Sequence, residues 1–375
     1  MEGLELRTPY FLVDERLLQK NLELLRQVAD EAGCKILLAQ KAFSMFACYP
    51  QIRRYLDGTT ASGLHEARLG REEFGGETHV FSPAYREDEF EELLSLADHF
   101  VFNSPGQVRK FGLRAKEAGK STGLRVNPEC STQEGHQIYD PCAPGSRLGT
   151  TLAQFDPELL PLLDGLHFHT LCEQDSDALE VTAAAFEEKF SPWLKGLKWL
   201  NLGGGHHITR PGYDVERLVR VIRRLRESYG AEIYLEPGEA VVLNAGFLVT
   251  SVLETLHNGV EIAILDASAA CHMPDVLEMP YRPPLAGAVG PGEKPFTYRL
   301  AGPTCLAGDV IGDYSFDRPL AEGSRLVFED MALYTMVKTN TFNGMRLPDI
   351  VLRKMDGQVE VVKSFGYETF KERLS

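Results

Sequence analysis

The chain has 375 residues, of which 43% are hydrophobic and 25% charged, a composition typical of a globular protein with a large core and long enough for two domains. Its 54 acidic residues outnumber its 39 basic ones, and the net charge of −15 excludes a typical nucleic-acid binder, which needs a basic surface. No apolar run reaches the roughly 18 residues that would cross a bilayer, so we expect no membrane partner.

The first predicted elements are a strand over 10–13 and a long helix. Asp14 is a typical helix cap, the apolar residues that follow it recur at helical spacing, and Gly33 is a typical helix end. A second strand, over 35–41, carries the apolar run Ile36 to Ala39 and then reaches a single lysine, Lys41.

Strands and helices alternate from there to about residue 240. The predicted strands are 35–41, 58–62, 78–82, 99–103, 122–127, 165–170, 198–203 and 232–236. The predicted helices are 46–56, 64–75, 87–97, 105–118, 177–194 and 214–229, and the long stretch 128–164 is an extended loop with a short helix at 156–163. Eight such units predict an α/β fold with a closed parallel (β/α)8 barrel over residues 14–240, and an open doubly wound sheet is the alternative.

The pattern changes in the last third of the chain. Strand-like segments without intervening helices occupy 241–256, 296–301, 324–329, 350–355 and 358–363, and turn-forming residues fill 274–295. This predicts an antiparallel β domain of sandwich or barrel type, made of residues 1–13 and 241–375, into which the strand at 10–13 pairs.

Four ends of the predicted barrel strands carry unusual residues, and barrel enzymes place their chemistry at such ends. They are Lys41, His169, the triglycine Gly203–Gly205 and Glu236. Each has an ordinary explanation by itself: a solvated lysine, a rim histidine, a turn, and an acidic residue before Pro-Gly. Together they suit pyridoxal 5′-phosphate, because a buried lysine can form an imine with its aldehyde, glycine N–H groups can hold its phosphate, and a carboxylate can keep its pyridine nitrogen protonated.

A metal site is the competing interpretation. His167 and His169 lie two residues apart and so share one face of a strand, a spacing that suits zinc. Glu236 and the pair His206-His207 could complete the ligand set of a barrel metallohydrolase. The residues alone leave this alternative open.

Further candidates lie in the predicted β domain. Cys305 lies in a loop bounded by glycine and proline, where its thiol could deliver a proton or could simply be a small buried group. Tyr334 could bind a phosphate or cap a core.

Longer motifs make the sequence resemble a known family. They include LAQKAFS at 38–44, RVNPE at 125–129, HFHTLCE at 167–173, NLGGGHHIT at 201–209, LEPGEA at 235–240, HMPD at 272–275 and GPTCLAGD at 302–309. Across nearly its whole length the chain resembles the fold-type III pyridoxal-phosphate-dependent decarboxylases, such as ornithine, diaminopimelate and arginine decarboxylases. Within them it is most similar to those that act on carboxynorspermidine and carboxyspermidine.

The resemblance implies a role for each candidate residue. Lys41 would carry the cofactor, His169 would stack on its ring, Glu236 would hold its pyridine nitrogen, and Gly203–Gly205 with Tyr334 would bind its phosphate. Cys305 would come from the partner subunit of a homodimer and protonate the substrate's α-carbon. Glu239, Asp275 and, less directly, Asp309 would contact the substrate.

One departure from the family pattern bears on specificity. Many ornithine- and diaminopimelate-type relatives have arginine where this chain has Glu239, which puts a phosphate contact in doubt and adds a carboxylate at the barrel mouth. Charge-assisted hydrogen bonds to Glu239 and Asp275 would favour a small cationic substrate, a carboxylated polyamine, over one with a distal carboxylate.

The predicted function is therefore decarboxylation of carboxynorspermidine and carboxyspermidine to norspermidine and spermidine. A decarboxylase or racemase of another diamino acid, and a cofactor-binding regulator without turnover, remain alternatives. The seven cysteines form no CxxC pair, and the N-terminus lacks a secretory signal pattern, which predicts a reduced, cytoplasmic protein.

Overall fold

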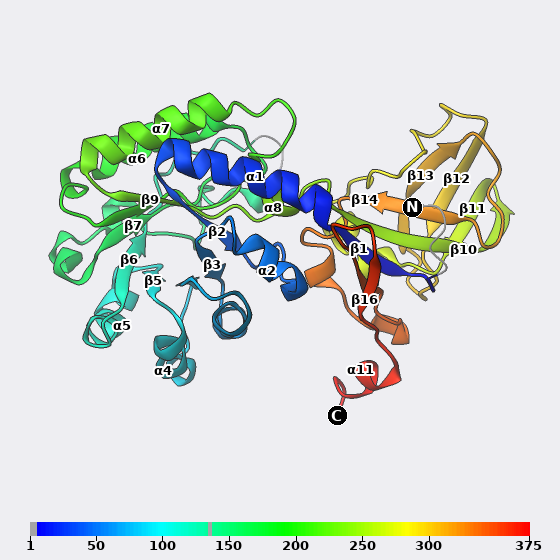
Figure 1. Cartoon of the computed structure of the whole chain (residues 1–375), viewed down its shortest axis with the longest axis horizontal. Helices are drawn as coiled ribbons and strands as arrows, with labels where there is room; N and C mark the ends of the chain where they lie inside the picture. The colour runs from blue at the N-terminus through cyan, green and yellow to red at the C-terminus, as the bar shows by residue number, and fades with distance from the viewer. Residues whose placement is uncertain (1–5, 134–136) are drawn as a thin grey trace. The chain divides into compact units, whose positions relative to one another are not determined.

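The structure, a computed structural model, describes residues 6–133 and 137–375 (Figure 1). The chain divides into two compact units. The barrel unit is Gln19–Val241, and the sheet unit is made of the described residues up to Leu18 and from Val242 onward. No helix in these described ranges combines the length and apolarity needed for a bilayer crossing.

Eight parallel strands form a closed barrel in the barrel unit, because each strand pairs with the next and the last pairs with the first. This confirms the closed barrel over the open sheet. The strands are β2 (Lys35–Ala39), β3 (Gly58–Ala61), β4 (Glu77–Phe81), β5 (His99–Phe102), β6 (Ser121–Arg125), β7 (Gly165–His167), β8 (Trp199–Asn201) and β9 (Glu232–Leu235).

Helices precede, connect and follow the barrel strands. They are α1 (Glu15–Ala32), α2 (Tyr49–Ile52), α3 (Leu64–Leu69), α4 (Glu87–Leu96), α5 (Pro105–Glu117), α6 (Ser176–Phe190), α7 (Val215–Tyr229) and α8 (Glu239–Val242). Two are shorter than predicted: α2 is preceded only by the 3-10 turn Phe46–Cys48, and α3 passes into a π-helical turn at Gly70–Phe74. The short helix expected at 156–163 is a 3-10 helix, Pro157–Leu162.

Side chains cap the starts of α1 and α5, and the Asp14 cap of α1 is the one that the sequence predicts. The Asp14 carboxylate accepts from the backbone N–H of Arg16 at 2.9 Å and of Leu17 at 3.4 Å, and Gly33 ends α1 with φ of 68°. At α5 the Ser104 hydroxyl accepts from the Gln107 backbone N–H at 3.3 Å.

Strand alternation decides which side chains enter the barrel. Leu37, Val101, Trp199 and Tyr234, from four different strands, pack together inside it, with Phe81 against them. Because side chains alternate with period two, the positions two residues further along each strand face the same interior. Because Tyr234 points into the barrel, Glu236, two residues further along, also points inward at the barrel rim.

The sheet unit holds eight strands in one sheet, ordered β13-β12-β11-β10-β1-β15-β16, with β14 also paired to β10. They are β1 (Tyr10–Asp14), β10 (Gly246–Asn258), β11 (Val260–Leu265), β12 (Phe296–Ala301), β13 (Val310–Phe316), β14 (Arg325–Glu329), β15 (Asp349–Arg353) and β16 (Val359–Lys363). β1 joins this sheet, as predicted, and most pairings are antiparallel. Two pairings are parallel, β1 with β15 and β11 with β12.

The sheet has a core on each face. Along β1, Tyr10 and Leu12 pack with Val249 and Val351, whereas Phe11 packs into the larger cluster on the other side. Short helices complete the unit: α9 (Ala269–His272), α10 (Asp275–Glu278), α11 (Tyr367–Lys371) and the 3-10 turns Met336–Lys338 and Phe342–Gly344.

Candidate active site

Lys41 lies two residues beyond β2, at the end of the barrel where the strands finish. Its side chain keeps contact with solvent, but its amine lies among protein atoms, and this burial lowers its pKa. The nearby cation Arg125 lowers the pKa further. The hydrogen bonds and ion pairs of the described residues include none from this amine, so it is available as a nucleophile.

Glu236 is buried immediately after β9, and both of its carboxylate oxygens are engaged. Oε1 accepts from the Asn201 amide at 2.8 Å, and Oε2 lies 3.4 Å from Nε2 of His167. Burial alone would raise the pKa of Glu236, but these hydrogen bonds outweigh it and bring the pKa to about 2. The carboxylate of Glu236 is therefore ionised at neutral pH.

His169 and Arg125 lie beside Lys41. The His169 Nδ1 accepts from the Gly204 backbone N–H at 2.8 Å, which fixes the ring and leaves its proton on Nε2. Burial, followed by the positive charges of Lys41 and Arg125, holds the pKa of His169 well below its usual range. The Arg125 guanidinium donates to the His169 carbonyl at 3.1 Å and lies over the Phe81 ring.

The triglycine after β8 packs so closely that no other residue fits. A Cβ at Gly204 would lie 2.4 Å from the carbonyl oxygen of Glu236, and one at Gly205 would lie 2.0 Å from that of Leu171. Gly203 and Gly205 also have φ of 70° and 80°. The Gly205 N–H donates to no described group, so it can hold an anion.

The histidines proposed as metal ligands do not converge. His167 faces Glu236, His169 is tied to Gly204, and the His206 Nε2 lies 3.4 Å from the Leu202 carbonyl oxygen. Among the described residues, three possible ligand atoms come together only elsewhere, at Glu77, His79 and His99. The metallohydrolase alternative is not supported.

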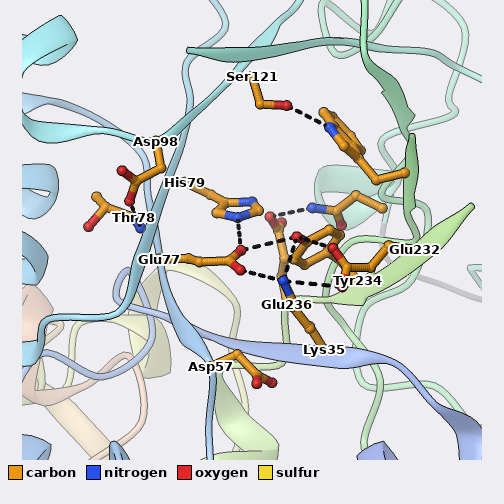
Figure 2. A network of polar contacts seen from close by, with 12 residues as sticks. Lys35, Asp57, Glu77, Thr78, His79, Asp98, Ser121, Glu232, Tyr234 and Glu236 are labelled. Carbon is orange, nitrogen blue, oxygen red and sulfur yellow. Dashed lines mark hydrogen bonds and ion pairs between the residues drawn. The ribbon is translucent and has the colours of Figure 1, made fainter. Parts of the chain in front are cut away.

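The Glu77 group lies toward the amino-terminal end of the barrel strands, where β4 and β5 begin, and Figure 2 shows Glu77 and His79 in the polar network there. The rings of His79 and His99 stack with centroids 3.9 Å apart and 8° between planes, so their in-plane lone pairs run parallel and cannot meet at one metal. The ammonium of Lys35 already pairs with Glu77 at 2.5 Å and with Glu232 at 3.1 Å. This network therefore supports the structure of the barrel and does not form a metal site.

Comparison with known proteins decides the family. The model of the family "Pyridoxal-dependent decarboxylase, C-terminal sheet domain" matches residues 13–332. A carboxynorspermidine/carboxyspermidine decarboxylase of Campylobacter jejuni is 43% identical, and the match covers 98% of this chain and 99% of that protein. The chain belongs to the pyridoxal-dependent decarboxylases.

Two further relatives refine this likeness. A carboxyaminopropylagmatine decarboxylase of Synechocystis is 44% identical to this chain, and the match covers 98% of this chain and 96% of that protein. The crystal structure of carboxynorspermidine decarboxylase complexed with norspermidine, from Campylobacter jejuni, matches with a TM-score of 0.92 at 42% identity, covering 98% of this chain and all of that one.

The cofactor of this family, pyridoxal 5′-phosphate, fits the residues that the decarboxylase brings together. Lys41 offers an uncommitted amine, Glu236 an ionised carboxylate, His169 a neutral ring in a fixed orientation, and the triglycine a free N–H. These match the aldehyde, the ring nitrogen, the ring face and the phosphate. All four predicted barrel positions therefore share one site at the strand ends.

The loop of Cys305 is organised within the sheet unit. The Cys305 backbone N–H donates to Oδ1 of Asn343 at 2.9 Å, and its side chain is exposed. Asp309 is buried and accepts from the hydroxyls of Ser268 at 2.9 Å and Thr304 at 2.7 Å. This geometry favours Asp309 as an organiser of the loop rather than as a substrate contact.

The other predicted positions have varied surroundings. Asp275 accepts from the Lys338 ammonium at 2.5 Å, so a substrate amine would have to compete with an internal cation. Tyr334 has φ of 51°, unusual for a tyrosine. In the barrel unit, the negative charge of Glu239 contributes, after burial and Glu173, to raising the pKa of the Cys172 thiol to about 12, so Glu239 lies near the rim.

Sequence reasoning assigned no role to Arg125 or Asn201. Burial lowers the pKa of Arg125 to about 10, and a buried cation beside Lys41 bears on the ionisation of the whole site. The sequence did contain a signal, since Arg125 lies in a predicted barrel strand as the last residue of β6, and Lys41 likewise follows the end of β2. Asn201 lies two residues before the triglycine, but nothing in the sequence distinguishes it from an ordinary residue at a strand end.

Proposed function

We propose that this decarboxylase removes the α-carboxylate of carboxynorspermidine and carboxyspermidine and releases norspermidine or spermidine with CO2. The observation that carries the proposal is the full-length likeness, at 43% identity, to an enzyme of that name. The 42% identical structure whose name includes bound norspermidine supports the same class of substrate.

The residues divide the chemistry among them. Lys41 would hold the cofactor through its side-chain nitrogen, Glu236 would bind the ring nitrogen, His169 would support the ring, and Gly203–Gly205 with Tyr334 would bind the phosphate. When bound, pyridoxal phosphate supplies a protonated aromatic ring that accepts the electron pair left by the departing carboxyl group. Cys305 then donates its thiol proton to the substrate's α-carbon.

Glu239 would set the preference for a cationic tail. Its carboxylate lies near Cys172 at the rim, and its negative charge attracts the ammonium groups of a polyamine and repels a distal carboxylate. Diaminopimelate carries such a carboxylate and would be a poor substrate.

A second substrate deserves testing because of one observation. The Synechocystis relative is named for carboxyaminopropylagmatine and is as similar to this chain as the Campylobacter protein is. Both named substrates combine a carboxylated aminopropyl end with a cationic tail, which is the feature that Glu239 would recognise.

The test is CO2 release from purified holoenzyme with each candidate: carboxynorspermidine, carboxyspermidine, carboxyaminopropylagmatine, diaminopimelate and ornithine. We expect the first two to give the highest kcat/KM. A higher kcat/KM for carboxyaminopropylagmatine would reassign the substrate, and exchange of the α-proton without CO2 release would identify a racemase and refute the proposal.

We also propose a cytoplasmic homodimer in which Cys305 serves the partner's site. Two apolar side chains beside the Cys305 loop are exposed, Leu306 by 44% and Phe342 by 50%, as expected for a surface that a second copy covers. All seven cysteines are free thiols, which suits a reducing compartment. Sedimentation analysis would test the dimer: a monomer at assay concentrations that retains full activity would refute shared sites.

A further inference from the structure

Asn201 connects two parts of the candidate active site. Its side chain is fully buried, its Oδ1 accepts from the Gly203 N–H at 2.9 Å, and its Nδ2 donates to Oε1 of Glu236 at 2.8 Å. A backbone hydrogen bond from the Glu236 N–H to the Gly203 carbonyl, at 2.8 Å, runs alongside. One amide thus fixes the triglycine relative to the Glu236 carboxylate.

His167 supports the other oxygen of the same carboxylate. Its Nε2 lies 3.4 Å from Oε2 of Glu236, and its ring stacks on Phe81 with centroids 5.8 Å apart. Burial lowers the pKa of His167, so the ring is neutral at pH 7. Its Nδ1 is buried without a partner, so the single ring proton belongs on Nε2, where Glu236 can accept it.

We propose that His167 and Asn201 are positioning residues that keep Glu236 ionised and aimed. His167 affects the reaction only through this carboxylate, whereas Asn201 also holds the triglycine through Gly203. The inference rests on the proposed role of Glu236 as the partner of the cofactor's ring nitrogen. Neither residue is expected to touch substrate or cofactor.

The chemistry of the two donors explains why they suit this position. Each carboxylate oxygen can accept two hydrogen bonds, so one donor on each leaves room for a third from the ring nitrogen. Both donors are neutral, so the carboxylate keeps its full charge for the protonated ring. A lysine or arginine in either place would neutralise that charge.

The pH behaviour of Glu236 also depends on its other neighbours. They are Lys41, which follows β2, Arg125 at the end of β6, His79 in β4, and His206 in the loop after β8. These groups are the same in every variant below, so differences between variants report the substituted side chains.

The test is a double-mutant cycle on the holoenzyme. His167→Leu and Asn201→Leu each remove one donor at similar size, and His167→Gln keeps a neutral N–H donor. We expect each leucine variant to lower kcat about tenfold or more and to move the acid limb of the kcat profile to higher pH, because a hydrogen bond to a charged group is lost. His167→Gln should restore most of both, a rescue that a purely structural role would not give.

The same substitutions are then made in Glu236→Gln, where the carboxylate is already absent. We expect His167→Leu to cause no further loss of kcat there, because the charge that its hydrogen bond supports is already gone, whereas Asn201→Leu still loses its bond to Gly203. Equal losses from His167→Leu in both backgrounds would overturn the inference while leaving the role of Glu236 intact. If Glu236→Gln itself keeps full turnover and an unchanged cofactor spectrum, the proposed role of Glu236 fails instead.

A spectroscopic measurement is independent of turnover. Nitrogen-15 NMR of histidine-labelled holoenzyme, assigned by the signal missing in His167→Gln, should show a neutral ring protonated on Nε2 between about pH 6 and pH 8. A doubly protonated ring, or a proton on Nδ1, would overturn the inference. Should Asn201→Leu fail to fold, as judged by circular dichroism, the two His167 variants and this spectrum decide the question.

Discussion

Gly204→Ala is the most direct test of the site's geometry. The added Cβ would lie 2.4 Å from the Glu236 carbonyl oxygen and 3.1 Å from Cε1 of His169. The first distance falls about 0.6 Å short of the 3.0 Å below which such contacts essentially never occur, so the triglycine or β9 has to move.

That movement acts on the chemistry more than on folding. The hydrogen bond from the Gly204 N–H to His169, now 2.8 Å, would stretch toward its limit and release the ring. Overpacking of this kind costs about 1–3 kcal/mol of stability, whereas a displacement approaching 1 Å in an active site lowers the rate about 100-fold.

The assay measures pyridoxal phosphate affinity by absorbance titration, kcat by CO2 release and stability by thermal unfolding. Gly106→Ala is the matched control, because its Cβ would meet only the Ser104 hydroxyl, at 3.7 Å, in the first turn of α5. We expect Gly204→Ala to lose affinity and kcat and Gly106→Ala to behave as wild type. A Gly204→Ala protein with unaltered affinity and turnover would refute the assigned packing of this loop.

Three further predictions address other groups. Lys41→Ala should abolish turnover and the visible absorbance of bound cofactor, and retained activity would disprove the lysine assignment. Cys305→Ala should keep the cofactor but turn over much more slowly, and an unchanged decarboxylation rate would mean that another group supplies the proton. Burial would raise the pKa of Glu77, but hydrogen bonds from His79 and Lys35 outweigh it and hold the pKa at about 2, below its ordinary value of 4.5. The stability that ionised Glu77 contributes is therefore present above about pH 4.5 and is lost as the pH falls toward 2. In urea titrations, the difference in free energy of unfolding between wild type and Glu77→Gln should shrink over that range. A difference that stays constant would contradict this.

The barrel could be predicted because its strands are short apolar runs separated by helical patterns. The four site positions followed from a general rule, that strand ends carry the chemistry, and all four lie together in the structure. The sheet unit was harder. β11 and β13 escaped detection, although Asn258-Gly259 between β10 and β11 is a typical hairpin turn.

The contacts between particular side chains could not be predicted from the sequence. Nothing in the chain order indicates that Asn201 reaches Glu236, or that His167 serves a carboxylate instead of a metal, because these contacts join strands far apart in sequence. The sequence likewise does not indicate that Asp309 accepts from the hydroxyl of Ser268, which comes from another loop. Composition and spacing identify reactive residue types, whereas three-dimensional pairing decides their use.

The two-residue alternation along the barrel strands makes the enzyme sensitive to a particular kind of change. Deleting one residue within β9 would turn Glu236 outward among the surrounding helices and bring Pro237 into its place, although no other side chain would change chemically. Insertions and deletions should therefore be tolerated in the long connection between β6 and β7 but should abolish activity inside the barrel strands. A new substrate pocket is best engineered by changing the length of that connection and keeping the strand lengths fixed.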